Sequence, residues 1–404
     1  MAERGGVSGS SLATEALHVY QSLNAPERVG FFEALIRDFS PSPDDVRVAA
    51  DGYHLDPSPA NLRRLQQVVE PPRQELFRRL NMTPGGTGAL VEMRRHLLDE
   101  LATHPDLEPI SSDLGHLLGS WFNGGFLTLE RIDWRSPAAT LEKLIAYEAV
   151  HQIQGWTDLR RRLEADRRCY AFFHSAMPGE PLIFIEVALT RGISTSIQPL
   201  IDPGAPVSDP ELADSAIFYS ITNCQKGLRG VPFGSSLIQR VVDDLRKSLP
   251  RIRTYSTLSP IPGFRRWLRQ ELLDPASVVN DPEIQQAEAQ IEANPEAKER
   301  LLGACAWYLL HGKRDNEPLD PVARFHLKNG ARLDRINWMA DTSAAGIQQS
   351  GGMMANYVYD PGELQKNHEA YLRAGTVCAS GRVERLARQI SRPRSQNWLT
   401  RHFL

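Results

Sequence analysis

The chain has few cysteines, and they are not arranged as a metal or disulfide site. Cys169, Cys224, Cys305 and Cys378 are widely scattered and form neither a Cys-x-x-Cys pair nor a Cys/His cluster. This spacing argues against a structural zinc site and against a framework of disulfides. We therefore expect reduced thiols, as in the cytosol.

Long apolar runs and an excess of one charge are also missing. No run of about 18 apolar residues occurs, which argues against a membrane-spanning helix, and residues 1–11 lack the apolar core of a signal peptide. The net charge is only −3, so nucleic acid and anionic membranes are not expected as partners. The chain ends in His402, Phe403 and Leu404 rather than the peroxisomal Ser-Lys-Leu. We expect a cytoplasmic protein.

The remaining composition is that of an ordinary globular protein, with 41% hydrophobic and 24% charged residues over 404 positions. This length exceeds the usual size of one domain, so two are expected. Residues 1–120 are typical of helices separated by proline, as where Ser58 and Pro59 supply an N-cap and a first helical residue. We predict a helical domain at 1–120, used for packing and self-association, and a catalytic domain at 121–404.

The second region alternates between strand and helix patterns. Residues 126–132 alternate as a strand, and a helix follows Pro137. Two further apolar runs, 169–173 and 182–189, are joined by a proline- and glycine-containing turn. The pattern indicates a mixed α/β domain.

A glycine-rich segment at residues 225–234 follows an apolar strand at 216–221. Downstream, one helical face carries Leu237, Ile238, Val241, Val242 and Leu245. Unpaired N–H groups at a helix start suit a phosphate or pyrophosphate, and Gly227, Gly230 and Gly234 would let the backbone approach it. A loop that merely turns a corner is the alternative, because a lone glycine-rich loop is a weak signal.

Five motifs in this order resemble the malonyl-CoA decarboxylase family, and the likeness runs from about Glu27 to about Tyr359. They are FHSAMPGEPL at 173–182, GLRGVPFG at 227–234, LSPIPGF at 258–264, FHLKNGA at 325–331 and INWMAD at 336–341. The resemblance implies an α+β fold, with an all-helical N-terminal domain followed by a GNAT-like acyltransferase-fold catalytic domain with a mixed, mostly antiparallel sheet. Since animal members carry the Ser-Lys-Leu tail, a bacterial, cytoplasmic member fits better.

The resemblance also implies the reaction, which converts malonyl-CoA to acetyl-CoA and CO2. The thioester carbonyl takes up the electrons as an enolate, so no metal, biotin or pyridoxal cofactor is expected. The expected partners are malonyl-CoA, acetyl-CoA and further copies of the chain, as a dimer or tetramer formed through the helical domain. The substrate-binding residues implied are Arg229, Gly230, Val231, Pro232, Phe233, Gly234 and Ser235. Arg229 either contacts the ligand or points into solvent.

The resemblance makes Ser259 and His326 the catalytic pair. Ser259 lies between a short strand at 254–258 and Pro260, where a Ser-Pro turn would otherwise be structural. His326 lies on a helix predicted to begin at the N-cap Asp320 and to end at Gly330. A lone histidine on such a helix is usually a core group.

The implied mechanism gives each member of the pair one task. Ser259 would hydrogen-bond the malonyl carboxylate or accept a proton from it. His326 would donate a proton to the enolate, and its ordinary pKa suits this near neutral pH. Backbone N–H groups or a nearby amide would hold the thioester oxygen.

Several further residues and functions remain open. His151 and His174 are interpreted as structural, whereas Asn337, Asp341 and Asn356 are candidates to line the pocket. One alternative function is a CoA-dependent N-acyltransferase on the same fold. Another is a non-catalytic acyl-CoA sensor with the helical domain as its output surface.

Overall fold

The computed structural model describes residues 7–231, 237–290 and 297–391. These fall into two compact units. Unit 1 consists of Met1–Glu130, Phe172–Ile183 and Asn223–Gly234, and unit 2 of Arg131–Ala171, Phe184–Thr222 and Ser235–Leu404. The helical N-terminal region therefore belongs to unit 1, and most of the sheet belongs to unit 2.

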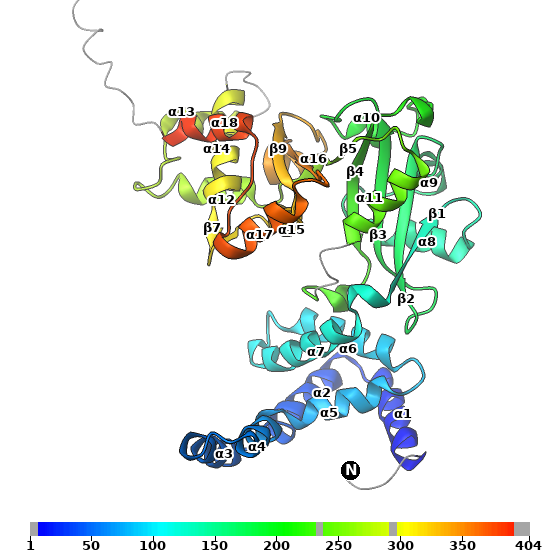
Figure 1. Ribbon diagram of the computed structural model, residues 1–404, viewed down its shortest axis with the longest axis vertical. Helices are drawn as coiled ribbons and strands as arrows, with labels where there is room; N and C mark the ends of the chain where they lie inside the picture. Colours follow the sequence, from blue (N-terminus) through cyan, green and yellow to red (C-terminus); the bar gives the residue numbers. More distant parts are fainter. Residues whose placement is uncertain (1–6, 232–236, 291–296, 392–404) are drawn as a thin grey trace, which may run out of the picture. The chain divides into compact units, whose positions relative to one another are not determined.

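Polar caps and prolines begin the helices of unit 1. Asn24 and Glu27 form a reciprocal capping box, and the predicted cap at Ser58 accepts the Asn61 N–H at 3.4 Å. The helices are α1 (Val7–Ser22), α2 (Ala25–Asp38), α3 (Pro43–Leu55), α4 (Pro59–Val69), α5 (Pro72–Asn81), α6 (Gly86–Glu100) and α7 (Glu108–Trp121) (Figure 1). Their core is formed by fully or nearly fully buried apolar side chains, among them Phe32, Phe77, Leu90, Leu97, Leu114 and Phe122.

The hairpin of α3 and α4 contributes little to this core. In these two helices, which are described in full, Ala49 is the sole buried side chain. Val48 and Leu55 on α3 are 49% and 83% exposed, and Leu62 and Val69 on α4 are 38% and 47% exposed. Each pair is spaced by seven residues and so shares one helical face. We call these four residues the hairpin stripe.

The second part of the chain is built on a mixed sheet. Among the described residues, eight strands join in the order β1-β2-β3-β4-β5-β10-β6, with β9 also paired to β10. The bounds are β1 (Leu127–Ile132), β2 (Arg167–His174), β3 (Pro181–Thr190), β4 (Ser215–Asn223), β5 (Thr254–Thr257), β6 (Ser259–Pro260), β9 (Arg332–Asn337) and β10 (Met354–Val358). β10 is antiparallel to β5, β6 and β9, whereas β4 and β5 are parallel. The predicted α+β class, an all-helical N-terminal region followed by a mixed, mostly antiparallel sheet, is confirmed.

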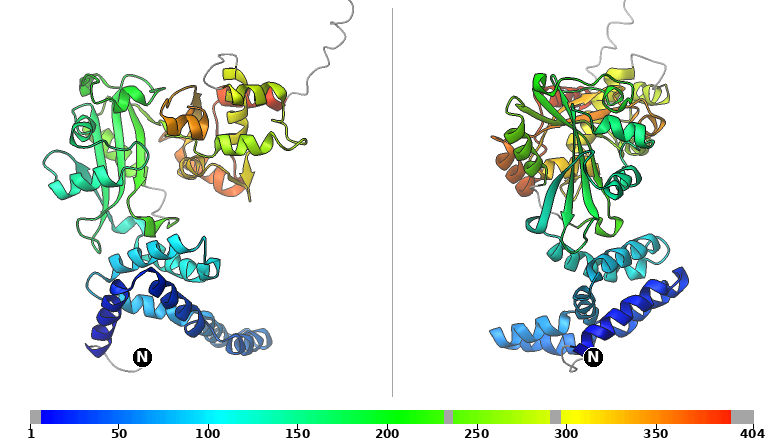
Figure 2. Two further views of the ribbon diagram at one scale, coloured as in Figure 1. Left: turned by 180° about the vertical axis from the view of Figure 1, so that it is seen from behind. Right: turned by 90° about the vertical axis from the view of Figure 1, so that its right-hand side faces the viewer.

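Helices and a small hairpin complete unit 2. The helices are α8 (Ala138–Tyr147), α9 (Trp156–Arg162), α10 (Gln198–Ile201), α11 (Leu237–Ser248), α12 (Phe264–Glu271), α13 (Pro282–Ala289), α14 (Ala297–His311), α15 (Pro321–Lys328), α16 (Ala344–Ser350), α17 (Leu364–Ala374) and α18 (Gly381–Ser391). Strands β7 (Lys313–Arg314) and β8 (Glu317–Pro318) form the hairpin. Seen from behind, α12, α14 and α18 gather beside β9 (Figure 2). Within the described parts of the chain, no helix is both long and apolar enough to cross a membrane.

Helix α11 links the two parallel strands β4 and β5 and lies across the sheet (Figure 1). The five apolar residues predicted for its inner face are all buried. The strands pair from Ser215 with Thr254 to Phe218 with Thr257. Beyond this point the Leu258 N–H still donates to the Phe218 carbonyl at 2.9 Å, but Ser259 pairs with Ala355 of β10. The two parallel strands therefore separate at Ser259.

Candidate functional site

Ser259 and His326, predicted from distant motifs, meet in unit 2. Ser259 Oγ lies 2.9 Å from His326 Nε2. Ser259 is 6% exposed and His326 is 3% exposed. A serine and a histidine at hydrogen-bond distance in a dry site form the geometry of an acid–base pair.

The hydrogen bonds around this pair run in one direction. Ser259 Oγ donates to Thr257 Oγ1 at 2.9 Å, and Thr257 Oγ1 also accepts the Tyr357 N–H at 3.1 Å. Because the Ser259 hydroxyl donates its one hydrogen to Thr257, its oxygen accepts a hydrogen bond from His326 Nε2–H. His326 Nδ1 then accepts from the Tyr359 hydroxyl, 2.8 Å away. This relay fixes the imidazole in one tautomer.

Burial keeps His326 uncharged. Desolvation lowers the His326 pKa from 6.5 to about 3, because the imidazolium is disfavoured away from water. The Tyr357 ring stacks on the imidazole at 4.7 Å and removes one more face from solvent. The expectation that His326 has an ordinary pKa is therefore wrong, because the buried imidazole stays neutral near pH 7.

Helix α15 places His326 as the sequence predicted. The Asp320 carboxylate caps it by accepting the N–H groups of Val322 and Ala323 at 3.0 and 2.9 Å. The helix ends at Lys328, and Gly330 follows with φ +80°. Burial raises the Asp320 pKa to about 6, although these N–H groups act against the rise. The cap thus anchors the helix that carries the imidazole.

Two asparagine side chains, one from β9 and one from β10, support the segment that leads to Ser259. Asn356 Nδ2 donates to the Thr257 carbonyl at 2.6 Å and to the Ser194 carbonyl at 3.1 Å. Asn337 Nδ2 donates to Asn356 Oδ1 at 2.7 Å. Of the three residues predicted to line the pocket, Asn356 therefore contacts the end of β5, two residues before Ser259, and Asn337 contacts Asn356. The third, Asp341, instead accepts the Ser343 N–H at 3.0 Å just before α16.

The glycine-rich loop lies only partly in the described residues. Arg229 and Gly230 are exposed and Val231 is buried, whereas Pro232, Phe233, Gly234 and Ser235 lie outside the described residues. The Arg94 guanidinium of α6 donates to the carbonyls of Gly227 and Arg229 at 2.6 and 2.9 Å. Within unit 1, α6 therefore holds the start of this loop.

Gly227 is required by packing within unit 1. A Cβ atom at this position would overlap the Val91 carbonyl of α6. Close approach of its backbone to a ligand stays a prediction. Gly230 has φ +79° and open space where a Cβ would stand. Its left-handed backbone conformation, and not a lack of space, therefore favours glycine here.

His174 and His151 make local contacts. His174 Nδ1 accepts the Ala176 N–H at 3.1 Å, and its ring packs on Phe122 at 4.8 Å. His151 is buried and its backbone N–H donates to the Glu148 carboxylate at 2.9 Å, whereas its Nε2 has no hydrogen-bond partner among the described residues. Across the described residues, no three His, Cys, Asp or Glu side chains group so that they could hold a metal ion.

Sequence reasoning missed Thr257, Tyr357, Tyr359 and Arg94. The available signal for the tyrosines is their spacing of two, which places both on one face at the end of β10. Thr257 ends β5 two residues before Ser259 begins β6, and their side chains meet in a hydrogen bond. Arg94 gave no signal, since its partners are backbone carbonyls more than 130 positions away.

Two sequence profiles match the chain. The profile of the malonyl-CoA decarboxylase N-terminal domain matches residues 39–122, and that of the C-terminal domain matches residues 125–397. Malonyl-CoA decarboxylase, mitochondrial, of Anser anser anser is 41% identical over 353 residues, which are 79% of this chain and 70% of that protein. The protein of the same name from Rattus norvegicus is 37% identical over 359 residues, 81% of this chain and 73% of that protein.

Crystal structures of bacterial proteins resemble the whole chain. Malonyl-CoA decarboxylase from Rhodopseudomonas palustris has a TM-score of 0.90 at 43% identity, covering 95% of this chain and 96% of that one. The protein of that name from Agrobacterium vitis has a TM-score of 0.86 at 45% identity, with the same coverage. The likeness therefore includes both the helical region and the sheet that carries Ser259 and His326.

Proposed function

Since this chain belongs to the malonyl-CoA decarboxylase family, we propose that its carboxy-lyase reaction takes place at Ser259 and His326. The observation that carries the assignment is the 2.9 Å contact between Ser259 Oγ and His326 Nε2 in a buried site. The substrate is malonyl-CoA and the products are acetyl-CoA and CO2. The bond from the α-carbon to the carboxylate breaks, and its electrons pass into the thioester carbonyl as an enolate.

His326 would supply the proton that ends the reaction. The imidazole is neutral in the empty site because burial lowers its pKa to about 3. A malonyl carboxylate placed beside it favours the charged form, so substrate binding would draw one proton from solution onto His326. That proton then passes to the α-carbon, and the imidazole returns to neutral. One proton is consumed for each CO2 released, as the overall reaction requires.

Ser259 and Tyr359 would have different tasks. Ser259 would turn its hydroxyl from Thr257 to the malonyl carboxylate and hold the breaking bond perpendicular to the thioester plane. Tyr359 would act as a positioning residue, because its hydroxyl contacts only Nδ1 of the imidazole in the relay. Burial raises the Tyr359 pKa, so the phenol stays protonated and remains a donor.

The pantetheine arm of CoA would lie along β4. Because β5 leaves β4 after Phe218, the β4 edge beyond that residue can offer backbone groups to the two amides of the pantetheine arm. The pyrophosphate would bind at residues 229–235, with Arg229 as a charged contact. We propose no metal, biotin or pyridoxal cofactor, since the thioester is itself the electron sink.

Purified protein tests this function directly. Incubation with malonyl-CoA and a metal chelator should release acetyl-CoA and CO2 in equal amounts. In a parallel incubation with acetyl-CoA and an amine, transfer of the acetyl group to the amine with release of free CoA, together with no CO2 from malonyl-CoA, would instead identify the N-acyltransferase. CoA binding without any turnover would identify the sensor, and either result would overturn the proposal.

Self-association is the proposed role of the helical domain at residues 1–120. The hairpin stripe supports it, because it leaves two spaced apolar pairs uncovered. Light scattering should show a dimer or tetramer that Leu55→Glu and Leu62→Glu weaken. Leu273→Glu is the control, as Leu273 is 84% exposed outside the hairpin. A monomeric wild type would contradict this role.

We propose a cytoplasmic location, which cell fractionation would test.

A further inference from the structure

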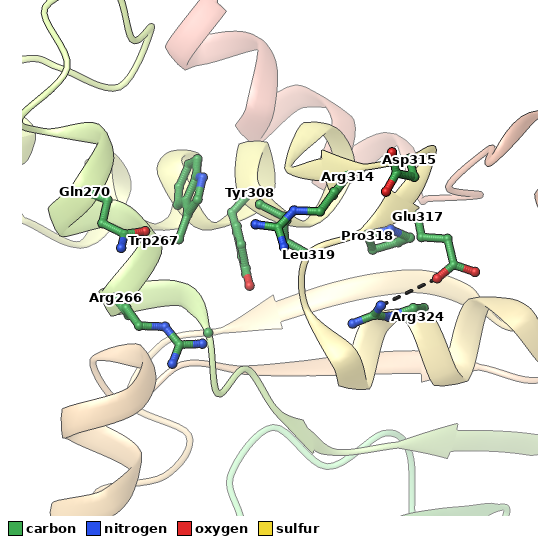
Figure 3. A pocket seen from close by; sticks show the side chains of 11 residues that line it. Arg266, Trp267, Gln270, Tyr308, Arg314, Asp315, Glu317, Pro318, Leu319 and Arg324 are labelled. Carbon is green, nitrogen blue, oxygen red and sulfur yellow. Dashed lines mark hydrogen bonds and ion pairs between the residues drawn. The ribbon is translucent and has the colours of Figure 1, made fainter. Parts of the chain in front are cut away.

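A cavity of about 610 Å³ lies within unit 2 beneath the β7–β8 hairpin. Its walls come from α12, α14, β7–β8 and α15 (Figure 3). Neither Ser259 nor His326 lines it. The volume is sufficient for a small metabolite.

Three arginines from three separate elements face this space. Arg266 of α12, Arg314 of β7 and Arg324 of α15 line it together with Tyr308, and Arg324 is the one that faces Glu317 (Figure 3). Among the residues that the structure describes, Arg266 and Arg314 have no ion-pair partner. Arg324 has a single long contact of 3.5 Å with Glu317. The cavity lining therefore holds three guanidinium groups and two carboxylates, those of Asp315 and Glu317, and Glu317 contacts only Arg324 among the three arginines.

The wall between the arginines is rigid and offers a neutral donor. The Tyr308 ring packs on Trp267 at 4.8 Å, and both side chains are at least nine-tenths buried. Burial raises the Tyr308 pKa, so its hydroxyl keeps its proton. A phenol between guanidinium groups supplies one more hydrogen bond to an oxyanion.

We propose that this cavity binds a small metabolite that carries several phosphate or carboxylate groups. Guanidinium groups match the planar faces of such oxyanions and bind them in pairs of hydrogen bonds. Glu317 would release Arg324 to the ligand, because their contact is long and nearly half-exposed on both sides.

The cavity shares two elements with the dyad. Gly263, which lines it, ends the turn that begins at Ser259, and a Cβ at Gly263 would overlap the Tyr308 hydroxyl. Arg324 precedes His326 by two residues on α15. A bound anion would therefore contact both segments that carry the dyad and change the rate of decarboxylation. This effect on rate rests on the proposed function, whereas binding does not.

Calorimetric titration of the full chain with inorganic pyrophosphate, in the presence of saturating CoA to occupy the site proposed at residues 229–235, tests binding. One ion per chain should then bind, and the double variant Arg266→Ala/Arg314→Ala should weaken that binding by about tenfold or more. Lys328→Ala removes an exposed cation of α15 outside the cavity and should leave the affinity unchanged. A parallel titration with citrate separates carboxylate from phosphate ligands.

Thermal melting of each variant without ligand shows that it is folded, so a loss of binding is assigned to the removed charge. Equal affinity in the wild type and the double variant would overturn the proposal, as would absence of binding by both probes. Binding of either probe that is lost only in the double variant supports it. These readouts do not use malonyl-CoA, so they stand even if no decarboxylation is found.

Discussion

Ser259 Oγ and His326 Nε2 lie 2.9 Å apart although 67 positions separate the two residues in the chain. One stands where a strand leaves its parallel neighbour, and the other is on a short helix capped by Asp320. Both backbones are fixed by features of their own: the Pro260–Pro262 turn and the α15 cap. The pair is therefore preorganised before any ligand arrives.

Ser259→Ala and His326→Ala should each lower kcat for malonyl-CoA by roughly 10²- to 10⁴-fold, the usual range for loss of an acid–base group. Steady-state release of CO2 measures this. CoA binding, followed by calorimetry, should be retained, because neither side chain is proposed to touch the pyrophosphate. Wild-type activity in both variants would sink the assignment.

Tyr359→Phe removes the hydroxyl that His326 Nδ1 accepts. The tautomer is then no longer fixed, so kcat should fall by about tenfold or more while KM changes little. Tyr255→Phe is the matched control, since its buried hydroxyl donates only to the Ile252 carbonyl. If the two variants lose activity equally, Tyr359 has only a structural role.

Acid should destabilise the protein through His326. Its folded pKa is about 3, against an ordinary value of 6.5. Between these values the unfolded chain binds the extra proton, so the free energy of unfolding falls as pH falls, by roughly 1.4 kcal/mol per pH unit. His326→Gln cannot take up this proton. Urea unfolding from about pH 7 to pH 4 should show a shallower slope for the variant, and equal slopes would refute the burial argument.

Gly227→Ala should loosen the start of the glycine-rich loop. The added methyl overlaps the Val91 carbonyl, and such overpacking costs about 1–3 kcal/mol. We expect a lower melting temperature together with a raised KM for malonyl-CoA. Gly52→Ala is the control: it adds the same methyl in open space within α3. An unchanged KM would separate loop packing from substrate binding.

The sequence predicted elements wherever local chemistry determines them. Asp320, Pro321 and Gly330 mark both ends of α15, and the apolar spacing of residues 237–245 marks the buried face of α11. The motifs identified Ser259 and His326, but not that they touch. That contact depends on where β5 leaves β4, which is a property of the sheet and not of any short segment.

The charge state of His326 could not be predicted from the sequence either, because it also depends on tertiary structure. An imidazole has its ordinary pKa unless its surroundings remove water. Here Tyr357 and Tyr359, from the end of β10, and Phe325, from the same helix as His326, surround the ring. Arg94 is a similar case, because an arginine that holds backbone carbonyls has no partner that a pattern of side chains would reveal.

The scarcity of buried side chains in α3 and α4 has a consequence for the dynamics of the chain. Without a tightly packed face, this hairpin can open without disturbing the rest of unit 1, so its amide hydrogens should exchange with deuterium earlier than those of α6 or α7. Any partner that covers the hairpin would slow this exchange, so protection at residues 43–69 would report on association one amide at a time.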